Sequence, residues 1–539
     1  MNLFLSELMK SKIFFAIIIF GIISCRHKSD DGRKFFRYNQ AAGIKSLDPK
    51  DATTQSTIWA CNQLYNGLVQ FDSSLKINPS IARSWEISSD GLTYTFHLRS
   101  DVFFHDNENF TGKKGRRVVA SDFVFSFSRI ENPSIAPDAC WVFADKVDSL
   151  NPFEAHDDST FIMHMKKVFP PMLGTLTTQI CSVVPKEIVE AEGNDFGIHP
   201  CGTGPFKFKA WREGEVMILE KNSTYFERDE NGIQLPYIDG IRISFIDSKT
   251  SEFLSFRQQQ LDLITDIDAS VKDEVLTKDG ELQPAFADLM RIQKCVNLCT
   301  EYIGFNLYAN GNEVNDAVKE KEFREAFSYG IDKEKLITYL RNGIGKAGNH
   351  GFVSYGLHFY NTDSVGGFSY NPSKAKELLK NLKDVSATIY CSTQNEAICS
   401  FVANELNQLG MKINVEAMQN KTLRQQEMNN QVSCFRASWI ADYADAESFL
   451  SCFYSHYGAG PNYTRYKNAA FDKLYDEAAS ELNDSLRNII YMRMDSLMMK
   501  DAPVVPLYYD EVVRFVQPTV SGLSNNPLNL LDLRRVKIK

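Results

Sequence analysis

The chain has 539 residues, 43% hydrophobic and 24% charged, with a formal net charge of −9. A single hydrophobic core stops growing at about 250–300 residues, so this length predicts at least two lobes of an ordinary soluble protein. The mildly acidic balance argues against a nucleic-acid partner, because such proteins carry a clustered basic surface. One short basic run, at 113–117, follows a Thr-Gly pair and is interpreted as a solvated loop.

The N-terminus has the pattern of a bacterial signal peptide. Lys10 and Lys12 precede an apolar run at 13–23 that is too short to span a bilayer comfortably. The run ends in Ile-Ile-Ser-Cys, which resembles a lipobox, where cleavage leaves an acylated cysteine, here Cys25. An uncleaved anchor or a chance cysteine is the alternative interpretation.

These features predict an exported protein that a lipid holds to the cell membrane or the outer membrane, facing the periplasm or the cell exterior. Residues 1–24 are then the lipoprotein signal peptide and 25–34 a polar tether. Translation starts at Met1 or at Met9. Ten further cysteines remain after Cys25, and an exported compartment permits disulfides whose pairing the sequence does not reveal.

Hydrophobic periodicity predicts alternating strands and helices along the mature chain. In the first half we expect a hairpin at 81–104 with a turn at Asp90-Gly91, a helix at 118–130 capped by Ser121, and strands at 206–211 and 216–220. The second half is more helical and is typical of an α/β lobe. Its predicted helices are 318–340, 371–382, 397–409, 471–482 and 486–499, and its predicted strands are 412–417 and 504–509.

An unusual pair of charges stands in the apolar run at 436–443. Arg436 and Asp442 flank residues that include Trp439 and Ile440. Ionised side chains are rarely buried unless an opposite charge or a hydrogen-bonding group pairs with them. The residues themselves leave two possibilities open, an internal ion pair or a site for a ligand with charged groups.

Motifs of catalysis, metal binding and cofactor binding do not stand out. The sequence lacks a GxSxG elbow, an HExxH helix, a CxxC pair and a calcium-binding EF-hand loop. A literal GxGxxG at 343–348 follows a predicted helix rather than a strand, so it lacks the context for phosphate binding. We therefore expect a binding protein with no cofactor and no metal, not an enzyme.

Several stretches, in order along the chain, resemble the family 5 extracytoplasmic solute-binding proteins of ABC importers, the oligopeptide- and dipeptide-binding group. The matching stretches are LDP at 47–49, LYNGL at 64–68, IARSW at 81–85, DGLTYTFHLR at 90–99, FHD at 104–106, VASDFVFSF at 119–127, GTGPF at 202–206, LEKN at 219–222, FREAFSYGID at 323–332 and APVVPLY at 502–508.

The resemblance implies an α/β fold, a two-lobed clamshell of the periplasmic-binding-protein type II with an extra β-rich subdomain in lobe I. It implies a partner permease in the membrane, and we expect a monomer. The expected divisions are lobe I at 35–72, 181–295 and 504–539, its accessory subdomain at 73–180, and lobe II at 296–503.

The resemblance also implies roles in a peptide site. Asp442 falls where peptide-binding relatives pair a carboxylate with the α-ammonium of the ligand, and Arg436 falls where they place a cation near ligand carboxylates. The ligand backbone is expected to add as a strand between two segments. Their residues are Thr53, Thr54 and Gln55 on one side and Ser438, Trp439 and Ile440 on the other.

Some positions depart from the family pattern. Gln419-Asn420-Lys421 stands where some oligopeptide binders carry a tryptophan, and Ile440 replaces a cysteine that is bridged in some relatives. The family includes binders of nickel chelates, haem and sugars, so another solute is the alternative ligand. An exported hydrolase or a surface adhesin is a more distant alternative.

Overall fold

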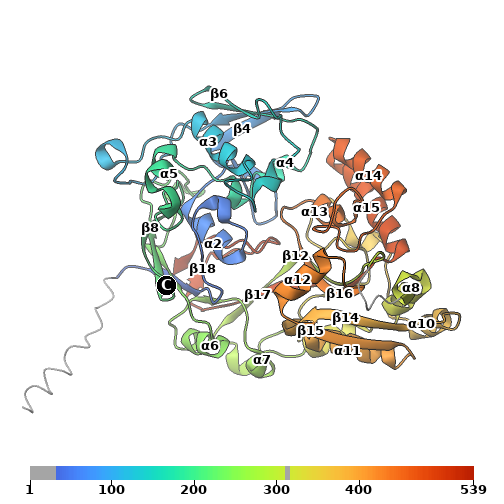
Figure 1. Cartoon of the computed structure of the whole chain (residues 1–539). Coiled ribbons are helices and arrows are strands. Elements are labelled where there is room, and N and C mark those ends of the chain that lie inside the picture. Colours follow the sequence, from blue (N-terminus) through green and yellow to red (C-terminus); the bar gives the residue numbers. More distant parts are fainter. Residues whose placement is uncertain (1–31, 310–315) are drawn as a thin grey trace, which may run out of the picture.

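The computed structural model describes residues 32–309 and 316–539, which form two lobes (Figure 1). Lobe I contains most of the first half of the chain and the C-terminal end, and lobe II contains most of the second half. Cys25, the signal peptide and most of the tether lie outside the described residues. Among the described helices, none has both the length and the apolar character needed to cross a membrane.

The largest sheet in the described chain runs through both lobes and has eleven strands. Ten of them follow the order β15-β14-β16-β12-β17-β11-β1-β10-β9-β8, and β13 pairs with β17. The bounds are β1 Phe35–Asn39, β8 Phe206–Arg212, β9 Val216–Lys221, β10 Gly240–Ser244, β11 Leu263–Ile264, β12 Arg291–Phe305, β13 Lys346–Ala347, β14 Ser386–Ser392, β15 Lys412–Met418, β16 Cys434–Ile440 and β17 Val504–Val516.

Lobe I adds an antiparallel sheet, ordered β4-β5-β7-β6, whose apolar side chains pack against the central helix α3. The first two strands are the expected hairpin, and Gly91 in its turn has a φ of 71°, which glycine adopts without strain. The bounds are β2 Val69–Phe71, β3 Ile77–Pro79, β4 Ala82–Ile87, β5 Thr93–Leu98, β6 Phe153–Asp157, β7 Thr160–His164, β18 Val520–Ser521, β19 Lys537–Ile538, α2 Gln55–Leu64, α3 Ala120–Glu131, α4 Met172–Thr175, α5 Lys186–Glu192, α6 Lys249–Arg257 and α7 Ala269–Val275.

Lobe II packs helices around β14, β15 and β16 (Figure 1). Its two larger cores join the sheet to these helices, one through Phe435 and Phe449 and the other through Phe327 and Leu406. The bounds are α8 Lys321–Tyr329, α9 Lys333–Leu340, α10 Pro372–Leu379, α11 Glu396–Asn407, α12 Asn420–Met428, α13 Glu447–Leu450, α14 Ala469–Ser480 and α15 Asp484–Asp501.

Two long strands connect the lobes. β12 and β17 pair with each other over most of their length, with a register shift between Val296 and Thr300. The last residues of β17 pair with β11 of lobe I, whereas Val505 and Leu507 pack in a core of lobe II. The expected lobe boundary at residue 296 therefore falls within β12, and the one at residue 504 falls at the start of β17. Both boundaries stay predictions.

Two expected helices differ from the structure. The helix expected at 318–340 is two helices, α8 and α9, because Gly330, a weak helix former, ends α8 and Asp332 caps a new helix by accepting from Lys335 N at 3.0 Å. Ser121 is not the cap of α3 but lies inside it. The strand expected at 504–509 is confirmed and continues to Val516.

Candidate functional site

Strand β16 leaves most of one backbone edge unpaired. Its other edge pairs with β12 along the whole strand, from Cys434 opposite Phe305 to Ile440 opposite Cys299. On the open side, β14 pairs with β16 only where Tyr390 meets Phe435, and the described residues place no further strand there. Such an edge offers N–H and C=O groups to an incoming extended chain.

A cavity of about 470 Å³ opens where β14 and β16 diverge, and its lining is mostly polar. Arg341, Arg424 and Arg436 face it with Glu301 and Glu427. Within the described chain, two buried lining atoms, Nε of Arg436 and Oε2 of Glu427, have no hydrogen-bond partner, although Arg424 Nη1 lies 3.5 Å from Glu427 Oε2 in an ion pair. Buried polar atoms are normally satisfied, so this cavity suits a polar group or water.

The positive charge of Arg436 is compensated by a residue of the protein itself. Its guanidinium forms a buried ion pair with Glu301, which lies opposite Ser438 on β12. Ser438 Oγ accepts from Arg436 Nη1 at 3.0 Å and donates to Glu301 Oε2 at 2.7 Å. The internal ion pair that the sequence left open is therefore present for Arg436, and the ligand role expected from the resemblance stays a prediction.

Asp442 differs from Arg436 because no described residue bonds its carboxylate. The loop after β16 is held firmly: Ser448 Oγ accepts from Asp442 N at 3.1 Å, and Trp439 Nε1 donates to Ser448 O at 2.7 Å. Asp442 is exposed as a residue, but neighbouring protein removes part of the water around its carboxylate. Burial among these neighbours raises its pKa to about 6, Glu447 adds to the rise, and Lys146 of lobe I opposes it. A carboxylate in this setting can accept a cationic group.

The neighbouring charges are already engaged. Glu447 is buried and accepts hydrogen bonds from the hydroxyls of Tyr443 and Tyr475. Lys146 Nζ donates to Trp141 O at 2.5 Å, and burial lowers the pKa of Lys146 although Glu447 raises it. Asp442 is thus the carboxylate of this group that remains available.

The other expected segment lies in lobe I, beside the C-terminal segment. Thr53, Thr54 and Gln55 are exposed; Thr54 is extended and caps α2, and Gln55 is already its first helical residue. The Asn529 carbonyl accepts from Gln55 Nε2 at 3.2 Å and from Trp59 Nε1 at 2.7 Å.

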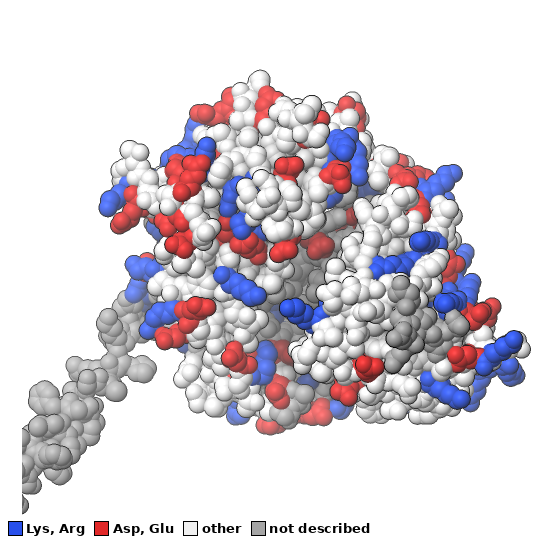
Figure 2. All heavy atoms as spheres, viewed as in Figure 1, with Lys and Arg blue, Asp and Glu red and all other residues white. Residues whose placement is uncertain are grey.

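The same C-terminal segment reaches the end of β16. Leu298 N donates to Pro527 O, and Ala441 N donates to Leu298 O, each at 2.8 Å. The C-terminal segment therefore links the two expected segments, whose role as walls of a ligand site stays a prediction. Figure 2 shows a hollow in this face of the molecule, with acidic and basic side chains around it.

The remaining predicted residues are distributed along this edge. Ile440 is 61% exposed, which is unusual for an isoleucine, and Trp439 is half-buried with its indole N–H engaged by the Ser448 carbonyl. Sequence reasoning missed Glu301, because β12 carries it far along the chain from Arg436, and only the strand pairing brings the two together.

One group of side chains has the arrangement of possible metal ligands. Ligand atoms of Cys299, Glu301 and Asp510 lie within 4.8 Å of one another. Glu301 is held by Arg436, Asp510 pairs with Arg341, and burial raises the pKa of the Cys299 thiol. Two arginines compete with a cation for these carboxylates, so the group fits a charge network better than a metal site.

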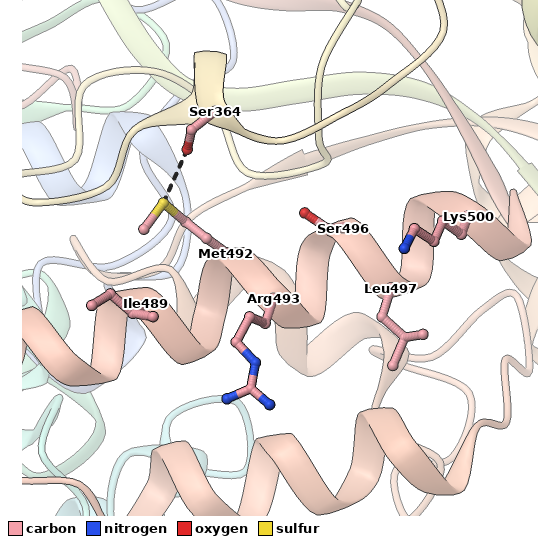
Figure 3. Close-up of a pocket in the computed structure, with 7 residues that line it drawn as sticks. All are labelled: Ser364, Ile489, Met492, Arg493, Ser496, Leu497 and Lys500. Carbon is pink, nitrogen blue, oxygen red and sulfur yellow. Dashed lines mark hydrogen bonds between the residues drawn. The ribbon is translucent and has the colours of Figure 1, made fainter.

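A second hollow, of about 370 Å³, lies on the outer face of α15 (Figure 3). None of the predicted site residues lines it. Its lining residues are Ser364, Ile489, Met492, Arg493, Ser496, Leu497 and Lys500.

Comparison with known proteins finds relatives that match over most of their length. The chain is 23% identical to the dipeptide-binding protein DppE of Bacillus subtilis, with 93% of this chain and 92% of the relative covered. It is 27% identical to heme-binding protein A of Haemophilus influenzae, with 86% and 85% covered.

Solved structures share the fold. The periplasmic binding protein DppA of Helicobacter pylori, solved with the peptide STSA, matches with a TM-score of 0.76 at 24% identity, covering 94% of this chain and 98% of that one. HbpA2 of Haemophilus parasuis matches with a TM-score of 0.80 at 21% identity, covering 94% and 100%. The model of the bacterial extracellular solute-binding proteins, family 5, matches residues 76–461, and the chain belongs to this family.

Proposed function

We propose that this chain is the solute-binding lipoprotein of an ABC importer, which captures peptides with a free N-terminus and delivers them to a membrane permease. The observation that carries the proposal is the available carboxylate of Asp442 at the end of an unpaired strand edge. The names of the relatives agree, since they include dipeptide-, di/tripeptide- and oligopeptide-binding proteins.

The ligand's α-ammonium would pair with Asp442, and its backbone would run antiparallel to β16 towards Ser438. Strand residues advance by about 3.3 Å, so the third or fourth ligand residue would reach the polar cavity beside Ser438. Recognition through the backbone tolerates different side chains. The cavity's unsatisfied polar atoms favour a polar group or water at that position.

The test uses trialanine and N-acetyl-trialanine with calorimetry. Trialanine should bind and raise the melting temperature, because a ligand that binds only the folded state stabilises it by mass action. Acetylation should remove binding. Asp442→Asn should weaken trialanine binding by about 1.5–3 kcal/mol, the range for a hydrogen bond to a charged group.

Asp288→Asn is a matched control, because it makes the same substitution at an exposed aspartate that lines neither cavity. Equal affinity of the native protein for both peptides, or an unchanged affinity in Asp442→Asn, would refute the assignment of the amine to Asp442.

A further inference from the structure

The residue after Asp442 crosses from one lobe into the core of the other. Tyr443 is 6% exposed and packs in the hydrophobic cluster of lobe I. Within the described residues it is the one member of that cluster between Leu263 and Val516. Its ring stacks on Trp141 with centroids 6.1 Å apart and meets Phe169 edge-on at 6.4 Å. Lobe II thus contributes one aromatic side chain to the interior of lobe I.

Lobe I makes the reciprocal contribution. Leu75, in the turn between β2 and β3, is 6% exposed and packs in a hydrophobic cluster whose other buried members come from Leu298 onward. Its φ is 62°, a left-handed conformation that costs a leucine energy. The turn is held by Asp72, whose carboxylate accepts from Ser74 N at 2.9 Å and Lys76 N at 3.0 Å. Hydrogen bonds of the turn hold Leu75 in this strained conformation. The strain indicates that the buried position of the Leu75 side chain is maintained at an energetic cost.

The Tyr443 contact is joined to the amine site. Its hydroxyl donates to Glu447, the carboxylate that raises the pKa of Asp442. On the lobe I side, Lys146 Nζ stands 5.5 Å from the Trp141 ring and 5.0 Å from the Phe169 ring, the two rings that hold Tyr443. Asp442 and Tyr443 are adjacent in the chain, so a shift of one moves the other.

We propose that Tyr443 and Leu75 are positioning residues that couple amine recognition to lobe closure. Each is buried in a cluster made mainly by the other lobe, so opening of the lobes would expose both side chains to water. A ligand amine that holds Asp442 also holds Tyr443 against Trp141 and Phe169. The inference rests on the proposed function for its link to the ligand, whereas the contacts between the lobes do not depend on it.

The competing interpretation is that Tyr443 only stabilises the loop after β16. The two differ in what they predict for binding kinetics. A closure residue acts mainly on the dissociation rate, since opening precedes ligand release. A loop-stabilising residue would instead loosen Asp442 and reduce the preference for a free amine over an acetylated one.

The experiment measures trialanine association and dissociation, and small-angle X-ray scattering with and without trialanine, for four variants. Tyr443→Ala and Leu75→Ala should each speed dissociation by about tenfold or more, with a small change in association. Both should raise the radius of gyration or prevent the compaction that trialanine causes. Tyr443→Phe, which keeps the ring, should stay within about threefold of native dissociation. Tyr370→Ala, an exposed tyrosine of lobe II, is the matched control and should change neither quantity.

A double-mutant cycle between Tyr443→Ala and Trp141→Ala tests the contact across the lobes. Their effects on affinity should be strongly non-additive, because either variant alone removes the same contact. Additive effects, or an unchanged dissociation rate and scattering profile in both alanine variants, would overturn the proposal. Variants that fail to fold are identified by circular dichroism, and Trp141→Leu then replaces Trp141→Ala as the lobe I partner.

The outcomes separate this inference from the proposed function. Failure of the native protein to bind trialanine would count against peptide capture. In that case a larger radius of gyration of ligand-free Tyr443→Ala would still support the closure role, and an unchanged one would overturn it. Normal peptide binding with unchanged kinetics in the variants would overturn the closure role alone.

Discussion

Arg436 and Asp442 occupy one short stretch of chain, but their charges are compensated differently. Arg436 lies within β16, where strand pairing sets it beside Glu301, so its charge is compensated before any ligand arrives. Asp442 lies beyond the last paired residue of the strand, where the sheet supplies no cation. The position of each charge relative to the end of β16 therefore decides which one is available for recognition.

Breaking the Arg436–Glu301 pair should reduce stability. Arg436→Met leaves the Glu301 carboxylate buried without its cation, and removing one partner of a buried ion pair costs about 3–5 kcal/mol. The free energy of unfolding from urea titration measures this. Arg436→Met combined with Glu301→Leu should recover most of the loss, because apolar replacement of both partners is often neutral. If Arg436→Met kept its stability and lost only affinity, Arg436 would be a ligand group.

Acidification should weaken peptide binding through Asp442. Its pKa is raised to about 6 in the ligand-free protein, so the carboxyl becomes neutral as the pH falls through that value. A peptide ammonium, with a pKa near 8, stays charged and favours the ionised carboxylate. Affinity for trialanine should therefore fall by about tenfold per pH unit below 6. Calorimetry between pH 5 and 8 checks this.

The stability of the ligand-free protein should respond to Asp442 in the opposite direction. A carboxyl whose pKa is higher in the folded than in the unfolded state favours folding when it is protonated. Its contribution is full below the unfolded value and is lost as the pH rises through about 6. Asp442→Asn should remove this contribution to the pH dependence of stability. The same variant should flatten the pH dependence of trialanine binding. A pH-dependence of trialanine binding that survives in Asp442→Asn would assign the titration to another group.

At the scale of the element, the open edge of β16 matters more than its side chains. β14 stops pairing after Phe435, and from there the strand presents backbone groups beside the cavity. Replacing the second amide N–H of trialanine with N-methyl should therefore cost about 1–3 kcal/mol, because a buried acceptor loses its donor. A serine at the same ligand position, which keeps the amide, should bind within about tenfold. Equal binding of the N-methylated peptide would exclude strand addition.

Local patterns predicted the elements well where capping and periodicity agree. Asn371 before Pro372 marks the start of α10, and the alternation at 412–417 marks β15. The break between α8 and α9 was missed because the apolar spacing continues through it, although Gly330 ends α8 and Asp332 caps α9. The Arg436–Glu301 pair and the Tyr443–Trp141 contact join distant segments, and no local pattern in one sequence encodes them.

At the scale of the molecule, β12 and β17 connect two lobes with separate cores, and we expect the lobes to move about this connection. A hinge of this kind uses a few residues where regular pairing is interrupted, and the register shift between Val296 and Thr300 is such a place. The clusters of the two lobes meet through Tyr443 and Leu75 rather than through one shared core. We therefore expect closure to be a change of packing between the two lobes, which a ligand can bias through its differential contacts.

The protein's attachment to a membrane should depend on Cys25. None of the described helices is suited to crossing a bilayer, and the lipobox-like run ending at Cys25 is the feature of the sequence that predicts an anchor. Cys25→Ser should block acylation and move the protein from the membrane pellet to the soluble fraction of lysed cells, or leave an uncleaved precursor. Lipid attachment adds about 0.8 kcal/mol per buried CH₂, so an acylated chain partitions strongly. Cys140→Ser, a change to a half-buried cysteine of lobe I, is the control and should leave the fractionation unchanged. A mature, membrane-bound Cys25→Ser protein would show that something other than a lipid on Cys25 holds it.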